Sequence, residues 1–121
     1  MNRVAVTGLG AVTPVGNNIE TMWENLIKGR HGIGPITRFD STGYKATLAA
    51  EVNGFDPLDY MEKPEARRLD LYSQYAIAAA EQAVRDSGID SAVDRNRFMV
   101  CFGSGIGGMR TIENEHEKLL A

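Results

Sequence analysis

The sequence predicts an α/β fold, with helices packed on a layered sheet, for three reasons. Residues 3–9 and 98–102 are apolar runs of strand length that contain β-branched or aromatic side chains. Segments with helical periodicity lie between these runs and after the second one. The composition, 43% hydrophobic and 24% charged over 121 residues, is that of one globular domain. The order strand, helix, short strand, helix, strand, helix therefore favours a sheet covered by helices.

The first predicted strand, residues 3–9, runs into a loop that is rich in glycine, proline and asparagine. A helix follows, and Asn17 is expected to cap it with Glu20 as its capping-box partner. Gly29 is predicted to end this helix. Its apolar side chains recur at helical spacing, at Ile19, Met22, Trp23, Leu26 and Ile27.

The middle of the chain predicts a surface loop, a short strand over residues 46–52 and then the longest helix. This helix is expected to begin near Pro64, which suits a first helical position, and to end at Gly88 in a left-handed conformation. Its alanines allow a neighbouring element to approach closely, so the helix is predicted to be well buried. One helical stripe holds Tyr72, Tyr75, Ala76, Ala79, Ala80 and Ala83.

The last part of the chain predicts a strand and a final helix. Residues 98–102 are apolar on both alternating faces, which is typical of a strand covered on each side. The helix begins near Met109 or Arg110 and stays in pattern to Leu120, with no residue that would end it. Because a sheet with only two long strands would also have open edges, residues 1–121 are interpreted as the N-terminal part of a longer protein, cut after Ala121.

A glycine-rich turn separates the last predicted strand from the last helix. Gly103, Gly105 and Gly108 occupy the three glycine places of a dinucleotide-binding turn. Such a site requires the first strand of a βαβ unit and an acidic residue about 20 positions beyond the turn, and the sequence ends before that position. Residues 7–14 form a second, poorer candidate, because Thr13 and Pro14 stand in place of the third glycine and the start of the helix. The other interpretation is a sharp turn beside a closely packed neighbour.

Composition excludes several classes of function. The net charge of −3 argues against nonspecific nucleic-acid binding, and no partner of that kind is expected. A single cysteine, Cys101, excludes an internal disulfide and a cysteine-rich zinc site. No apolar run is long enough to cross a bilayer, and the N-terminus lacks the pattern of a signal peptide. The sequence therefore predicts a cytoplasmic protein without membrane contact.

Four collinear motifs resemble the N-terminal third of the β-ketoacyl-acyl-carrier-protein synthases, and among them the elongating type II enzyme of fatty-acid synthesis. They are "RVAVTGLGAVTPVGNN" from Arg3, "GIGPITRFD" from Gly32, "ARRLDLYSQYAIAAAEQAVRDSG" from Ala66 and "GSGIGG" from Gly103. The resemblance implies a thiolase-like layered αβαβα fold, of which this chain would be most of the first half. It implies an acyltransferase, typically a homodimer, that condenses an acyl thioester with malonyl-acyl-carrier protein and releases carbon dioxide.

The resemblance also implies two sites, and it favours an acyl-contact role for the glycine turn over the dinucleotide interpretation. Ile106, flanked by Gly105 and Gly107, would contact the acyl tail near the dimer interface. The basic residues Lys63, Arg67 and Arg68 would dock the acidic carrier and its phosphopantetheine-linked acyl and malonyl groups. From the sequence alone, the alternative for these cations is a solvated helix face paired with Glu62 and Glu65. Pro64 departs from the family pattern.

The family's catalytic cysteine and two histidines come later than the matched region, so no catalytic residue and no cofactor are predicted here. Cys101 lies within a predicted strand, His31 in a glycine-rich loop and His116 on an acidic helix. Glu113, His116 and Glu117 share a helical face and could together hold a metal. Exposed charged helix faces are much more common than metal sites, so no metal is predicted. Two alternatives stay open: a non-catalytic fragment or partner subunit, and a dinucleotide-binding module.

Overall fold

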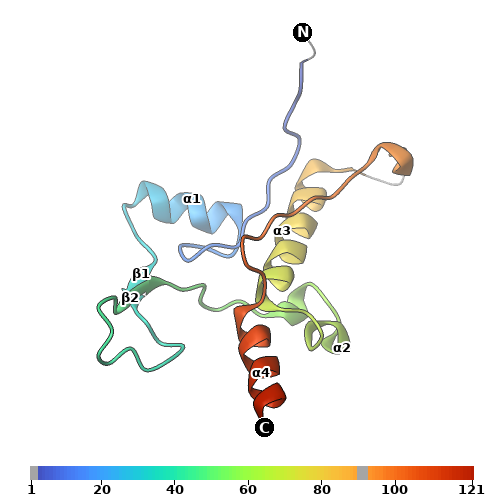
Figure 1. Cartoon of the computed structure of the whole chain (residues 1–121). Helices are drawn as coiled ribbons and strands as arrows, with labels where there is room; N and C mark the ends of the chain where they lie inside the picture. Colours follow the sequence, from blue (N-terminus) through green and yellow to red (C-terminus); the bar gives the residue numbers. More distant parts are fainter. Residues whose placement is uncertain (1–2, 90–92) are drawn as a thin grey trace.

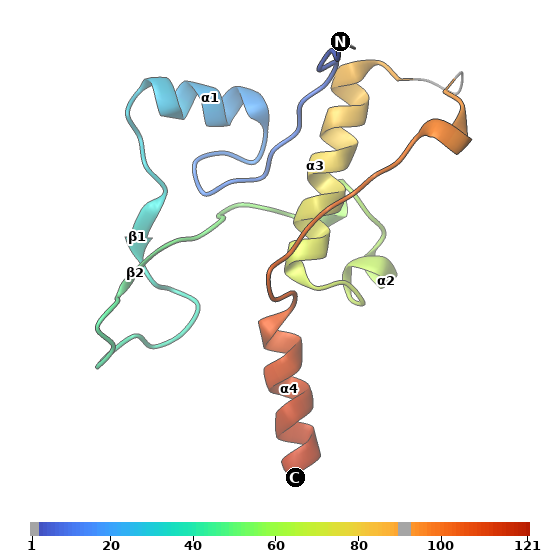
Figure 2. The ribbon, with the colours of Figure 1, turned by 45° about the horizontal axis from the view of Figure 1, so that its top comes forward.

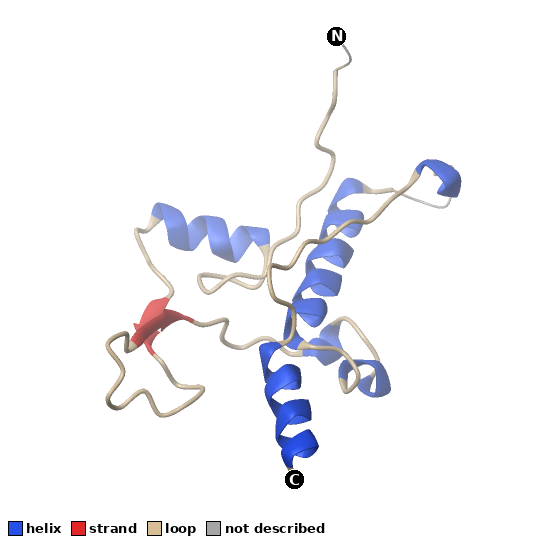
Figure 3. Cartoon of the chain, viewed as in Figure 1, coloured by secondary structure: helices blue, strands red, loops and turns tan. Residues whose placement is uncertain are grey.

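The structure is a computed structural model that describes residues 3–89 and 93–121 (Figure 1). Helices and loops make up most of it, and strand is confined to one short hairpin (Figure 3). None of the described helices combines the length and apolar character that crossing a bilayer requires. The elements in chain order are α1 (Ile19–Ile27), β1 (Ile33–Pro35), β2 (Leu48–Ala50), η1 (Pro57–Asp59), α2 (Lys63–Ala66), α3 (Leu71–Ser87), η2 (Arg95–Arg97) and α4 (Met109–Leu120).

The hairpin pairs β1 and β2 in antiparallel fashion, with Ile33 opposite Ala50. β2 confirms the centre of the strand predicted over residues 46–52, whereas β1 lies in a segment predicted as loop. The Thr37 hydroxyl donates to a Glu51 carboxylate oxygen over 2.6 Å, and the Thr37 N–H donates to the other oxygen over 3.1 Å. These bonds join the segment after β1 to the segment after β2, just beyond the paired strand residues.

The prediction of two long strands at residues 3–9 and 98–102 is wrong for the part of the chain that the structure describes. Both segments are extended, but neither forms a ladder with another described segment. Their apolar side chains are exposed, with 91% of Val4 and 59% of Val100 accessible, and Cys101 is exposed as well. An apolar pattern makes a strand possible, but a strand exists only where a second backbone accepts its hydrogen bonds. The layered sheet is therefore not formed within the described residues.

Helix α3 lies beside the N-terminal segment, the α2 region and the segment that leads into α4 (Figure 2). It carries Ala78, the one buried hydrophobic side chain among the described residues, so the close packing predicted for this helix is only partly present. The first segment lies along α3 through backbone donors: the Leu9 N–H reaches an Asp86 carboxylate oxygen over 2.8 Å, and the Ala11 N–H reaches the Gln82 side-chain oxygen over 3.2 Å. Gly88 ends α3 in the predicted left-handed conformation, with φ of 62°.

The cap of α1 is one residue later than predicted. Asn18, not Asn17, accepts from the Thr21 N–H over 2.8 Å. The Asn17 side chain instead donates to the Asn53 carbonyl over 2.9 Å, which ties the start of α1 to the segment after β2. The prediction of a capping box between Asn17 and Glu20 is therefore wrong, because Asn18 holds the capping position and the Asn17 amide nitrogen is directed toward Asn53.

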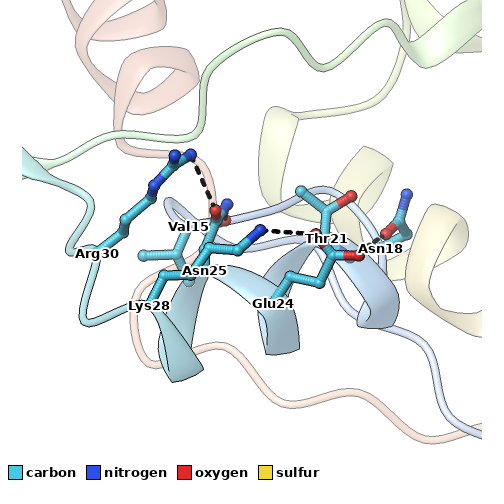
Figure 4. Close-up of polar contacts among 7 residues, drawn as sticks. All are labelled: Val15, Asn18, Thr21, Glu24, Asn25, Lys28 and Arg30. Carbon is cyan, nitrogen blue, oxygen red and sulfur yellow. Dashed lines mark hydrogen bonds and ion pairs between the residues drawn. The ribbon is translucent and has the colours of Figure 1, made fainter.

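The end of α1 is fixed by a second amide side chain (Figure 4). Asn25 donates to the Val15 carbonyl over 2.6 Å and accepts from an Arg30 guanidinium nitrogen over 3.3 Å. Glu24 and Lys28 form an ion pair of 3.1 Å on the same helix. Asn25 thus joins the loop before α1 to the turn after it, and the predicted end of the helix at Gly29 is confirmed by its φ of 68°.

Candidate functional site

The glycine turn, residues 103–108, changes direction between an extended segment and α4. Gly107 has φ of 84°, a left-handed conformation that favours glycine, and its N–H donates to the Ser104 hydroxyl over 2.9 Å. A Cβ on Gly105 would meet no atom within 4 Å, and Gly105 has no positive φ. Of the two glycines that flank Ile106, only Gly107 is therefore required by the turn itself.

A groove of about 450 Å³ lies beside this turn, between α3 and the segment that leads into the turn. Its volume falls within the range of small-molecule sites. The lining is mostly apolar and aromatic, from Val12, Tyr72, Ser73, Tyr75, Ala76, Ile77, Ala79, Phe102, Gly103 and Ser104. Ile106 is not among the lining residues, and 71% of it is exposed. The described chain thus brings the glycine turn to the groove while the Ile106 side chain faces outward.

The N-terminus of α4 already holds an anionic group. Asp70 accepts a hydrogen bond from the Thr111 hydroxyl in the first turn of α4. A Cβ on Gly108, the residue that begins this helix, would overlap the Asp70 carboxylate. A dinucleotide turn offers this position to a pyrophosphate, and a second anion here would be repelled. The glycine pattern therefore lacks both the preceding strand and the free helix end of a nucleotide site.

The basic cluster, Lys63, Arg67 and Arg68, lies on and just after α2. The Arg67 N–H bonds to the Lys63 carbonyl over 3.2 Å, so these two residues are one helical turn apart, as predicted. All three side chains are exposed. The ion pairs found among the described residues join other partners, and none involves the basic cluster with Glu62 or Glu65. The cluster therefore presents three cations that no described carboxylate pairs.

The long helix predicted from Pro64 is two helices, and Pro64 stands in the first turn of the short one, α2. The backbone leaves the helical conformation at Asp70, where ψ is 153°, before α3 begins. The Gln74 side chain donates to the Ala66 carbonyl over 2.8 Å and to the Leu69 carbonyl over 3.0 Å. These bonds satisfy carbonyls at the end of α2 and hold the basic cluster against α3.

The remaining candidate side chains do not form a catalytic group. Cys101 is exposed on an extended segment, which corrects its predicted burial in a strand, and it does not begin a helix. His31 and His116 are both exposed. Within residues 3–89 and 93–121, no three histidine, cysteine or carboxylate side chains come together as metal ligands. Glu113 and Glu117 lie exposed on α4 with His116.

Sequence patterns missed the side chains that position both candidate sites. Asp70 and Gln74 carry no distinctive sequence signal of this role, because both look like ordinary polar residues at the start of an alanine-rich helix. An aspartate before a helical run is a recognisable capping signal, but its partner Thr111 lies 41 residues away. That contact could be found only from the structure.

Comparison with known proteins places the chain in a family. Residues 1–120 match the family described as beta-ketoacyl synthase, N-terminal domain. The chain is 47% identical over 119 residues to 3-oxoacyl-[acyl-carrier-protein] synthase 2 of Staphylococcus aureus, and 40% identical over 119 residues to the protein of the same name from Synechocystis sp.. Each alignment covers 98% of this chain and 29% of the relative. The chain belongs to the beta-ketoacyl synthase family, and it spans less than a third of the length of these relatives.

Solved structures agree with this assignment. The ishigamide ketosynthase/chain length factor superposes with a TM-score of 0.76 at 30% identity, covering 95% of this chain and 29% of that one. A type II PKS ketosynthase, solved in complex with its acyl-carrier protein and bound to the hexaketide, gives a TM-score of 0.72 at 27% identity with the same coverage. The arrangement in Figure 1 is therefore similar to the corresponding part of ketosynthases.

Proposed function

We propose that this chain is part of a 3-oxoacyl-acyl-carrier-protein synthase, an acyltransferase that elongates fatty acids by decarboxylative Claisen condensation. In that reaction malonyl-carrier loses carbon dioxide, and the resulting carbanion attacks the carbonyl carbon of an acyl thioester. A carbon–carbon bond forms and the thiolate leaves. The observation that carries the proposal is the 47% identity over 119 residues to 3-oxoacyl-[acyl-carrier-protein] synthase 2.

Within such an enzyme the chain would supply binding surfaces. Gly105, Ile106 and Gly107 would form part of the acyl pocket near the interface of a homodimer. In support, the glycine turn to which they belong borders the groove through Gly103 and Ser104. The fold of the whole would be the layered αβαβα arrangement of thiolases, in the cytoplasm, with this chain as most of the first half. The large exposed apolar side chains, such as those at residues 98–102, would then lie in its core.

The basic cluster would dock the acyl carrier. An acidic carrier fits three exposed cations, and complementary charge of this kind raises the encounter rate and fixes orientation. One solved relative is a ketosynthase in complex with its acyl-carrier protein, which supports a carrier as partner. The phosphopantetheine arm of that carrier would deliver the acyl and malonyl groups.

The proposal is tested with a chimaera in which this chain replaces the matching N-terminal segment of the Staphylococcus aureus relative. We expect the chimaera to condense an acyl-carrier primer with malonyl-carrier. The 121-residue chain alone is expected to perform neither acyl transfer nor condensation. Cys101 is not at a helix N-terminus, and no hydrogen bond joins it to a described histidine. Acylation of Cys101 in the isolated chain, detected by mass spectrometry and followed by turnover, would refute this assignment. Carrier binding without condensation would favour a non-catalytic partner subunit.

Docking is tested in the same chimaera by changing Arg67 and Arg68 together to glutamate. Carrier association should slow and the remaining binding should depend less on salt. Decarboxylation of a small carrier-free malonyl thioester should persist, because it needs no docking. Unchanged carrier affinity at low salt would make the basic cluster a solvated helix face.

A further inference from the structure

The start of α3 contacts both the glycine turn and the backbone on either side of Arg67 and Arg68. Asp70, the residue before the helix, does not use its side chain to cap α3, although its carbonyl accepts from the Ser73 and Gln74 N–H groups over 2.9 and 3.1 Å. The carboxylate turns instead toward α4. One turn later, the Gln74 amide turns toward the end of α2. These two side chains therefore leave the same helix end in different directions.

Asp70 supplies what the start of α4 lacks. The capping position of α4 is Gly108, which has no side chain, and the first turn of α4 contains no acidic residue. The Asp70 carboxylate lies against Gly108 and accepts from the Thr111 hydroxyl. A carboxylate at this end complements the partial positive charge of the helix. A carboxylate from a residue 41 positions before Thr111 thus lies at the N-terminus of α4 and bonds to a side chain of its first turn.

Tyr72 adds a contact to the same turn. Its ring lies 3.9 Å from the position that a Cβ would take on Gly107. Asp70 and Tyr72 thus lie against Gly108 and Gly107, the two residues that directly follow Ile106. Contacts from the start of α3 therefore lie directly beside the backbone that carries Ile106.

We propose that Asp70 is a positioning residue that fixes the glycine turn to α3, while Gln74 fixes the basic cluster to the same helix end. This inference rests on the proposed function, in which the turn contacts the acyl tail and the cluster docks the carrier. It predicts that acyl-length preference and carrier affinity are separable by substitutions one helical turn apart. Longer acyl tails depend on the turn, whereas carrier encounter depends on the cluster.

The main test compares Asp70→Ala with Gln74→Leu in the chimaera described above. Asp70→Ala should lower kcat/KM for long primers about tenfold relative to short ones, the size typical of one lost hydrogen bond to a charged group, with little change in carrier affinity. Gln74→Leu should weaken carrier binding and leave the ratio of long to short primers unchanged. A primer ratio in Asp70→Ala equal to that of the unmodified chimaera would overturn the proposal.

Thr111 offers a matched pair of controls. Thr111→Val keeps the shape of the side chain and removes the hydroxyl donor, whereas Thr111→Ser keeps the donor. Thr111→Val should reproduce the primer preference of Asp70→Ala. Thr111→Ser should keep the primer preference of the unmodified chimaera. Because the two residues share one bond, the double substitution Asp70→Ala and Thr111→Val should be no worse than the more severe single one. Additive effects would mean that the bond does not position the turn.

Failure of the proposed function has a different signature. If the unmodified chimaera does not condense at all, the acyl role is wrong, but the contact itself is still measurable. Hydrogen exchange of the peptide covering residues 104–111 should then be faster in Asp70→Ala and Thr111→Val than in the unmodified chimaera or Thr111→Ser. Equal exchange in all four proteins would overturn the positioning role of Asp70 independently of activity.

Discussion

Two glycine-rich segments of this chain look alike in sequence and differ in the physical reason for their glycines. In the first glycine segment, residues 8–10, a Cβ on Gly8 would overlap the Ala83 carbonyl and one on Gly10 would overlap the Ala79 carbonyl. In the glycine turn, residues 103–108, Gly107 is required by its φ of 84°. The first segment uses glycine to approach a helix backbone, whereas in the second Gly107 reverses the chain and Gly108 leaves room for the Asp70 side chain.

The largest expected effect comes from filling the close approach. Gly10→Ala in the chimaera should lower the free energy of unfolding by about 3 kcal/mol, since the two nearest atoms that the methyl group meets belong to the α3 backbone and cannot rotate away. Denaturant unfolding measures the loss. Gly34→Ala is the matched control, because nothing lies within 4 Å of the added methyl group and its φ is not positive. That control should change stability by less than about 0.5 kcal/mol.

A second substitution separates the function of the glycine turn from its conformation. Ile106→Phe adds volume where the acyl tail is proposed to lie, at a cost of about 1–3 kcal/mol in a packed site. Long primers should therefore be condensed more slowly by the chimaera, while short primers lose less. Condensation rates are compared across primer lengths. Equal losses for short and long primers would remove Ile106 from the acyl pocket.

Gly107→Ala tests the conformational requirement of the turn. An alanine held at φ of 84° costs about 1–2 kcal/mol relative to glycine. The loss should appear in the denaturant midpoint and be smaller than that of Gly10→Ala. If Gly107→Ala proves the more damaging of the two, the comparison between a packed segment and a turning segment is reversed.

The smallest expected effect concerns the hairpin, where the Glu51 side chain accepts hydrogen bonds from Thr37 beside the paired strands. The Thr37 hydroxyl, and then its N–H, lower the pKa of the Glu51 carboxyl below its usual 4.5. A carboxyl whose pKa is lowered by folding stabilises the fold above its unfolded pKa, and this is lost as the pH falls through the lowered value. Glu51→Gln should therefore destabilise the chimaera slightly at pH 7, and the difference should vanish in acid. A difference that persists below the lowered pKa would assign it to packing.

Local signals predicted most of the helical structure. The apolar spacing of residues 19–27 and the left-handed glycines at Gly29 and Gly88 were sufficient for α1 and for the end of α3, because such features depend on neighbours within one or two turns. The final helix was likewise predicted, and α4 begins at Met109. The four motifs identified the family, which the match over residues 1–120 confirms.

Tertiary structure decided what distant partners control. Residues 3–9 and 98–102 have strand patterns, yet without a paired backbone among the described residues they remain extended and exposed. The Gln74 amide bonds across the break between α2 and α3, and Asp70 meets Thr111 beside the glycine turn. The sequence by itself determined the family, through the four motifs, and the local helices, through apolar spacing and the glycines at their ends. Each of these signals lies within a short stretch of the chain. Only the fold decided which polar side chains meet, because hydrogen bonds between residues 41 positions apart leave no periodic trace in the chain.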